Sequence, residues 1–155
     1  MQTLTRRIRR AERILDPVQG SSGQILALRM AQNAEDPTII ALQTGALMIG
    51  EYNASRPLTS SGEILVSNFI VRNTSAQSNR QSIEISFSIT RTLSLPNGLS
   101  YGRDFSALVT LFADDKLEGN SCSCTAPTCT ANVYSWEYCT EQTCTASPAT
   151  FICNE

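Results

Sequence analysis

The chain has 155 residues, of which 41% are hydrophobic and 17% charged, and its formal net charge is −2. This length is enough for one domain with a core of its own, and the composition is that of a water-soluble globular protein. It contains no histidine and a single lysine, which removes the commonest general base and the commonest metal ligand. Because no serine has a base beside it in the sequence, we expect no enzyme and no catalytic residue.

The first sixteen residues have the spacing of an amphipathic helix. Leu4, Ile8, Ala11 and Leu15 recur at helical intervals, which places them on one face. Asp16-Pro17 ends the pattern, because the residue before a proline avoids the helical conformation. We therefore predict a helix over residues 1–16.

Charge is divided between the two ends of the chain. The first thirteen residues hold five arginines against one glutamate, whereas residues 114–155 hold six acidic residues against one lysine. This asymmetry argues against a nucleic-acid partner. The arginines near the N-terminus form a cluster: Arg6, Arg7, Arg9, Arg10 and Arg13. This cluster is either a solvated helix face, a contact between subunits, or a surface that binds a membrane or DNA.

From Gln24 onward the apolar residues follow a β pattern. The clearest stretch is SIEISFSITRT, in which isoleucine or phenylalanine alternates with polar residues, as in a half-buried antiparallel strand. Thr44-Gly45 marks a hairpin turn between two short apolar runs. The predicted strands cover residues 23–30, 37–43, 46–52, 63–73, 82–92 and 104–112, with a turn-rich link at 95–102. One helix followed by successive strands predicts an α+β fold, in which the helix packs on an antiparallel sheet.

All six cysteines lie in the last 34 residues. They are Cys122, Cys124, Cys129, Cys139, Cys144 and Cys153. An even number of cysteines in a small polar segment favours three disulfides, and six cysteines allow 15 pairings. Two C-x4-C pairs keep a zinc site open as the alternative, and free thiols as a third. Disulfides would place the protein outside the cytoplasm, in the periplasm or at the cell surface, once a targeting segment has been removed.

Two further groups near the C-terminus are candidates for binding. Asp114, Asp115 and Glu118 offer carboxylates for Ca²⁺, although three acidic residues in five also suit a solvated turn. No other cofactor is expected. Tyr134, Trp136 and Tyr138 form an aromatic group, either a ligand-binding surface or an anchor that holds the Cys-rich region on the domain.

Several stretches together resemble the periplasmic part of type IV pilin-like proteins, namely the minor pilins and the type II secretion pseudopilins. They are RRIRRAERI followed by DPVQG, then PLTSSGEILVSNFIVRNTS, QSIEISFSITRTL and DFSALVTL. Val66, Asn68 and Phe69 match the V-x-N-F strand pattern of that family. The similarity covers residues 2–112. The Cys-rich region departs from the family, in which one C-terminal disulfide is common.

The resemblance implies a structural subunit of a type IV pilus or a type II secretion pseudopilus. Its partners would be other subunits of the filament, and it would contact the inner membrane only through an apolar N-terminal helix that this chain lacks. The domains would be a truncated helix (1–16), a sheet domain (17–113) and a Cys-rich region (114–155). The alternative is a secreted, adhesin-like module that binds a surface ligand through the disulfide-rich region.

Overall fold

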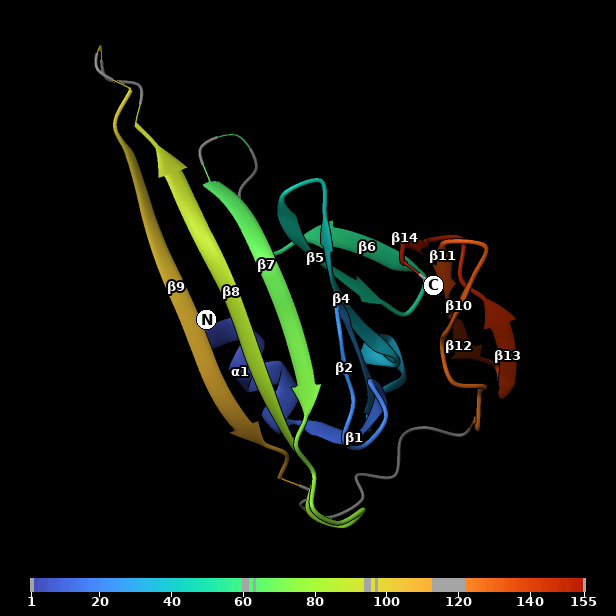
Figure 1. Ribbon diagram of the computed structural model, residues 1–155. Coiled ribbons are helices and arrows are strands. Elements are labelled where there is room, and N and C mark those ends of the chain that lie inside the picture. The colour runs from blue at the N-terminus through green and yellow to red at the C-terminus, as the bar shows by residue number, and fades with distance from the viewer. Residues whose placement is uncertain are drawn as a thin grey trace.

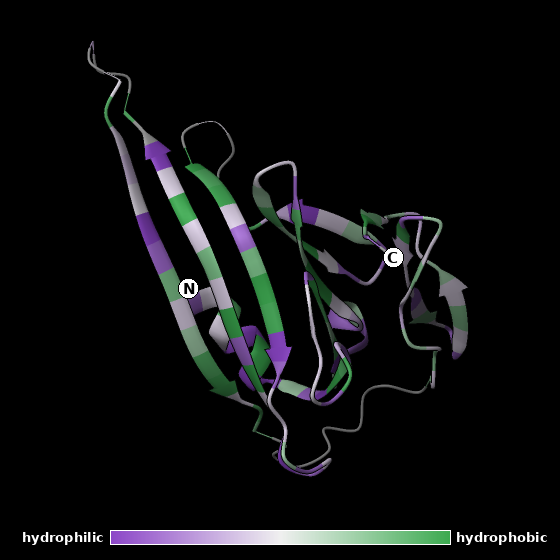
Figure 2. Ribbon diagram, in the orientation of Figure 1, coloured by the Kyte–Doolittle hydropathy of each residue, from purple (hydrophilic) through white to green (hydrophobic). Residues whose placement is uncertain are grey.

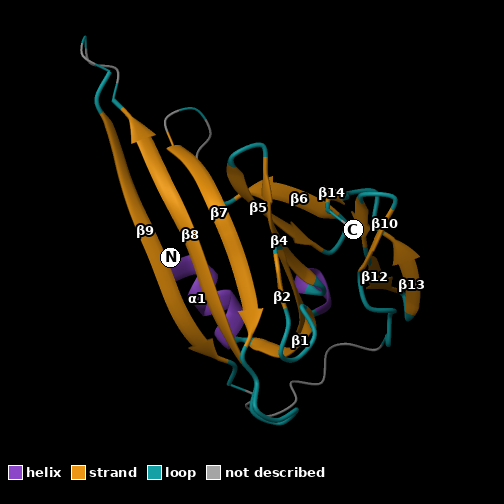
Figure 3. Cartoon of the chain, in the orientation of Figure 1, coloured by secondary structure: helices purple, strands orange, loops and turns teal. Residues whose placement is uncertain are grey.

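The computed structural model describes residues 2–59, 62, 64–93, 96, 98–112 and 122–154, and its elements are almost all β-strands (Figures 1 and 3). Within these residues there is one α-helix, α1 (Gln2–Arg9), and one 3-10 turn, η1 (Asn33–Glu35). The strands form four antiparallel sheets. They are β1 (Ala11–Asp16), β2 (Ser22–Gly23), β3 (Ile25–Met30), β4 (Thr38–Gln43), β5 (Ala46–Glu51), β6 (Ala54–Pro57), β7 (Ile64–Asn73), β8 (Ser82–Thr92), β9 (Ser100–Thr110), β10 (Thr128–Thr130), β11 (Val133–Ser135), β12 (Glu137–Thr140), β13 (Thr143–Ala146) and β14 (Phe151–Ile152).

Two sheets packed face to face make the main core. One has the order β1-β3-β4-β5-β6 and the other the order β2-β7-β8-β9. Their facing side chains include Leu26, Ile40, Phe69 and Ile85, each no more than 1% exposed. The fold is therefore all-β, and the predicted α+β class is wrong. Helix α1 has eight residues and contributes only Leu4 and Ile8 to a core that the two sheets build.

The predicted helix over residues 1–16 stops early. The structure has helix only to Arg9, and β1 then pairs with β3, with Ala11 opposite Met30. Ala11 and Ile14, not Leu15, point into the main core. A short apolar run fits both periodicities, and here pairing with a buried strand outweighs the helical spacing.

The strands predicted between residues 23 and 92 are present, with small differences at their ends. Strand β8 spans the predicted residues, and Ile83, Ile85 and Phe87 are all buried in the core. Figure 2 shows the corresponding alternation of hydrophobic and hydrophilic residues along β8. Thr44 and Gly45 both have positive φ between β4 and β5, as a two-residue hairpin turn requires. The last strand of the sandwich, β9, begins at Ser100 rather than at the predicted residue 104.

A third layer covers the outer face of the five-stranded sheet (Figure 1). This C-terminal layer, residues 122–154, consists of the three-stranded sheet β10-β11-β14 and the hairpin β12-β13. Its rings pack on Ala27, Ile39 and Ala41. Because both faces of the central sheet are covered, all six residues of β3 are buried, which explains why all of them except Arg29 are apolar.

Candidate ligand-binding site at the edge of the C-terminal layer

Three disulfides hold the C-terminal layer together, as the cysteine pattern predicted. They join Cys122 to Cys139, Cys124 to Cys144 and Cys129 to Cys153, so no cysteine is free. Their sequence separations are 17, 20 and 24 residues. In the chain-entropy model, a loop of this size stabilises the folded state by about 3 kcal/mol. Disulfides of this kind are typical of extracytoplasmic proteins.

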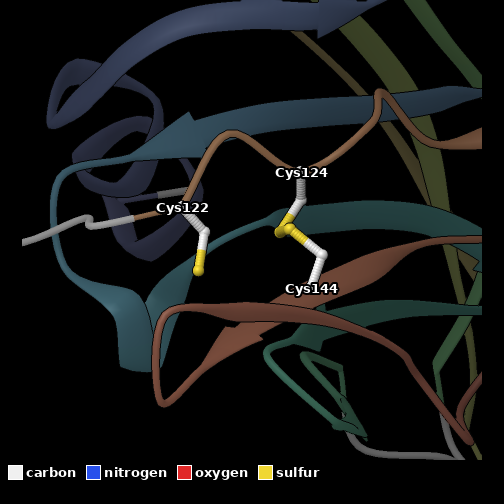
Figure 4. A group of neighbouring side chains, drawn as sticks. All are labelled: Cys122, Cys124 and Cys144. Atoms are coloured by element: carbon white, nitrogen blue, oxygen red, sulfur yellow. A yellow bond between two sulfur atoms is a disulfide. The ribbon is translucent and has the colours of Figure 1, made fainter.

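Two of these bridges lie side by side. Cys139 and Cys144 are opposite each other in the β12-β13 hairpin, and each bonds to the segment that precedes β10. The sulfurs of Cys122, Cys124 and Cys144 lie within 4.8 Å of one another (Figure 4). Zinc binds thiolates, and in this state every one of these sulfurs is in a disulfide. The structure thus supports disulfides over the zinc and free-thiol alternatives.

The aromatic residues of the layer face the sandwich. Tyr134 and Trp136 are only 2% and 3% exposed. The Trp136 indole nitrogen donates a hydrogen bond to the carbonyl of Tyr52 at 2.8 Å, and the ring of Tyr138 lies 4.3 Å from that of Tyr52. These contacts anchor the layer on the sandwich, and a ligand-binding role of the aromatic group stays a prediction.

The position of Trp136 also explains a glycine in β5. A Cβ atom built on Gly50 would lie 2.8 Å from the indole of Trp136, closer than carbon atoms can pack. The glycine thus lets the indole approach the backbone of the central sheet closely.

A buried ion pair makes a second link between the layer and the sandwich. Arg29 contacts Asp36 at 3.0 Å and donates to the carbonyl of Cys124 at 2.9 Å. Asp36 also accepts a hydrogen bond from the backbone of Met30 at 2.8 Å. A buried charge is tolerated when it is paired and hydrogen-bonded, and this network positions the first bridged segment on the sheet.

A hollow of about 540 Å³ opens where the C-terminal layer meets the ends of the central strands. We call it the junction hollow. Its lining is contributed by distant parts of the chain: Asp16, Gly23, Gln24, Ile25, Leu42, Gln43, Thr44, Cys129, Tyr134, Ile152, Cys153 and Asn154. Amides, a hydroxyl and a carboxylate therefore converge beside apolar side chains, a combination that is common in small-molecule sites.

One wall of the junction hollow is held by a pair of side-chain hydrogen bonds. The amide of Gln43 donates to the carbonyl of Ile152 and accepts from the backbone nitrogen of the same residue, both at 3.0 Å. Cys153, the next residue, is bridged to Cys129. The C-terminal side of the hollow is thus held in place by both a hydrogen-bonded pair and a covalent bond.

The lining of the junction hollow includes a half-buried carboxylate, that of Asp16. The hydroxyl of Tyr134 donates to Oδ2 of Asp16 at 2.8 Å. Burial raises the pKa of Asp16 above its usual 3.8, and the hydrogen bond from Tyr134 partly offsets this rise. Burial and the neighbouring carboxylate raise the pKa of Tyr134. Tyr134 therefore keeps its proton at neutral pH and remains the donor.

A second hollow, of about 610 Å³, lies on the outer face of the four-stranded sheet. Arg72 and Glu84 sit opposite each other on neighbouring strands there. Its other lining residues are Gly20, Ser21, Ser22, Ile70 and Ser86. The carboxylate of this hollow, Glu84, is exposed, whereas Asp16 in the junction hollow is half-buried.

The arginine cluster is divided by the structure. Arg7 forms ion pairs with Glu35 and, at 2.9 Å, with Glu51, so it ties α1 to the sandwich. Arg10 lies 3.8 Å from Glu35. Arg6, Arg9 and Arg13 are exposed. A contact between subunits through these arginines stays a prediction.

The predicted calcium ligands Asp114, Asp115 and Glu118 lie outside the described residues. In the part of the chain that the structure describes, no helix is long and apolar enough to cross a membrane.

The junction hollow was not predicted from the sequence. Asp16 was interpreted only as a helix end, and its partner Tyr134 is 118 residues away. Gln43 is an ordinary last residue of a strand. The sequence carries no signal for either role, because the site exists only once the C-terminal layer is folded onto the sandwich.

No family model, curated protein or solved structure matches this chain. The resemblance to type IV pilins and pseudopilins is wrong, because the fold it implies, a helix packed on one sheet, is not the fold observed. The described residues instead form four antiparallel sheets and one helix of eight residues. Val66 and Phe69 lie in the core between the two sandwich sheets, where any β-sandwich requires apolar residues.

Proposed function

We propose that this protein is a non-catalytic binding module that acts outside the cytoplasm and holds a small, uncharged, hydroxyl-rich ligand in the junction hollow. A sugar unit has this chemistry. The observation that carries the proposal is the convergence of Asp16, Gln24 and Asn154 from three separate segments on one hollow of about 540 Å³. This develops the expectation of a binding module that uses the disulfide-rich region.

The lining disfavours an anionic ligand. Among the lining residues that the structure describes, Asp16 is the one acidic residue and none is a lysine or an arginine, so an anion would meet no opposite charge there. Oδ2 of Asp16 already accepts from Tyr134, which leaves Oδ1 to accept from a ligand hydroxyl. Gln24 and Asn154 are exposed at the rim and can both donate and accept.

The hollow also offers an apolar side and a rigid frame. Leu42 and Ile152 line it, and Ile152 is 69% exposed, which suits the C–H face of a sugar ring. The Cys129–Cys153 bridge and the hydrogen bonds of Gln43 fix this side before any ligand arrives. A preformed site loses less conformational entropy on binding than a flexible one.

The location outside the cytoplasm is supported by the three disulfides, since thiols stay reduced in the cytosol. The absence of catalysis is supported by the absence of histidine from the sequence.

The test is a titration of ¹⁵N-labelled protein with a panel of mono- and oligosaccharides, followed by amide chemical shifts. We expect shifts to cluster at Gln24, Thr44 and Asn154. Gln24→Ala and Asn154→Ala should each weaken binding by roughly 2- to 10-fold, the effect of one hydrogen bond. Ser86→Ala, on the outer face of the other sheet, is the matched control. If no saccharide moves the junction amides, or if both variants bind like the native chain, the proposal fails.

A further inference from the structure

Strand β9 is a long edge strand whose outer side is unpaired in the described part of the chain. It ends the sheet order β2-β7-β8-β9 and forms one side of the molecule (Figure 1). All eleven of its residues pair with β8 without a register shift. It therefore presents an uninterrupted row of backbone donors and acceptors, which is a template for another strand.

The other edges of the sandwich are protected. Strand β2 has two residues, β1 contains two register shifts, and β6 has four residues and ends at Pro57. Short length, bulges and proline are the devices by which proteins prevent pairing at an edge. Strand β9 has none of them, so its open edge stands apart from the other three.

The backbone hydrogen bonds show which residues of β9 face outward. Leu93 donates to the carbonyl of Leu99, and Leu111 donates to the carbonyl of Gln81, both at 3.0 Å. Hydrogen-bonded pairs alternate along an antiparallel ladder, so the odd-numbered residues of β9 bond to β8. The even-numbered residues direct their N–H and C=O groups to the open edge. They are Ser100, Gly102, Asp104, Ser106, Leu108 and Thr110.

We propose that β9 docks, antiparallel, on β9 of a second copy of this chain, about a twofold axis at Phe105. Phe105 is the central residue of the strand, so this register pairs all eleven residues. Each outward-facing residue then meets an outward-facing residue of the second copy, and the two four-stranded sheets become one continuous sheet. The expected pairs are Ser100 with Thr110, Gly102 with Leu108, Asp104 with Ser106, Tyr101 with Val109, Arg103 with Ala107, and Phe105 with itself.

The side chains fit this register. Phe105 stacks on Phe87, with ring centroids 5.3 Å apart, and at the axis it would meet its own copy in a non-hydrogen-bonded pair, where side chains approach most closely. Arg103 lies over the ring of Phe105 at 5.4 Å. It would face an alanine, and Asp104 would face a serine, so no two like charges are opposite each other.

The same register covers exposed apolar residues. Leu108 is 68% exposed and Tyr101 is 66% exposed, and both lie on the edge strand. Leu108 would pack over Gly102 of the second copy. A Cβ atom on Gly102 would make only ordinary contacts within its own chain, at 3.9 Å, so packing inside one chain does not require a glycine there. The pairing of Gly102 with Leu108 of the second copy gives a reason for the glycine.

The first test measures mass and amide exchange of the native protein across a concentration series. Light scattering should show a change from the 16.9 kDa chain to twice that mass as concentration rises. Over the same range, the amides of Asp104, Ser106 and Leu108 should become protected from hydrogen exchange. Those of Arg103 and Phe105, which bond to β8, should be protected throughout.

Ser106→Pro is the variant that breaks the edge. It removes an outward N–H without touching the ladder to β8, and we expect the dimer dissociation constant to rise by at least about tenfold. Ser106→Ala keeps the N–H and should dimerise like the native chain.

Three results would overturn the proposal. The first is a protein that stays monomeric at all concentrations with exposed even-numbered amides. The second is a dimer in which those amides stay exposed, which would place the interface elsewhere. The third is a monomer in which they are protected, which would mean that another part of the same chain covers the edge.

Discussion

The sandwich and the C-terminal layer are stabilised in different ways. The sandwich buries a large set of aliphatic and aromatic side chains between two sheets and contains no disulfide. The layer contributes mainly Tyr134, Trp136 and Phe151 to a small second core, and it holds all three bridges. Apolar burial stabilises the first, and cross-linking of short strands stabilises the second.

The difference implies that the two regions depend on each other unequally. Half of the second core belongs to the sandwich, through residues such as Ile39 and Ala41 on β4. The layer has no core of its own and needs the central sheet as a base. The sandwich has its main core on the other face of that sheet, so it can persist when the layer is loosened.

The largest effect is expected from a cavity in the main core. Phe69 on β7 is 1% exposed, and Phe69→Ala should lower the free energy of unfolding by about 3–5 kcal/mol, with loss of both regions together. Its neighbour Ile70 is 49% exposed, and Ile70→Ala should cost far less. Urea unfolding followed by circular dichroism measures both. Equal losses for the two variants would contradict this division of the core.

Loss of one bridge should separate the two regions. Replacing Cys129 and Cys153 by serine opens the bridge with the longest sequence separation and should destabilise the layer by about 2–4 kcal/mol. Amide exchange should accelerate in β10, β11 and β14 while β8 keeps its protection. If β8 lost protection to the same extent, the sandwich would depend on the layer and the comparison would fail.

The smallest effect is a pH dependence at the contact between the regions. Because the pKa of folded Asp16 is raised above 3.8, the folded state binds this proton more tightly than the unfolded state. The stability from this group is therefore present below about pH 3.8 and is lost as pH rises through the folded pKa. Asp16→Asn keeps an acceptor for Tyr134 and removes the titration.

The measurement is the free energy of unfolding between about pH 3 and pH 7 for the native chain and for Asp16→Asn. We expect the native chain to lose stability relative to the variant as pH rises from about 3.8. If the free energy of unfolding changed with pH equally in both proteins, the carboxylate of Asp16 would not contribute to the pH dependence of stability.

The sequence predicts an element well when neighbouring residues determine it, and poorly when residues far away in the sequence do. Strand β8 was predicted because its alternation is local and one of its faces is buried. Strand β1 was mistaken for the end of a helix, because Ala11 also fits the helical spacing and only pairing with β3 decides between the two. The pilin resemblance failed for a related reason: alternating apolar strands describe many antiparallel sheets equally well.

The C-terminal layer shows the same limit. Its cysteines indicated disulfides, since composition alone carries that signal, but the strands of the layer are two to four residues long and have little apolar periodicity. These short strands form because the disulfides and the central sheet hold them in place. The junction hollow was beyond prediction, because Asp16 and Asn154 meet only after that docking.

The contact between Trp136 and the central sheet has a practical consequence. The chain contains a single tryptophan. Its indole is 3% exposed, lies against Gly50 and donates to the carbonyl of Tyr52. Its fluorescence therefore comes from one place, where the C-terminal layer touches the sandwich. Detachment of the layer would shift this emission to longer wavelength even while the sandwich stayed folded, so the protein carries its own optical probe of that docking.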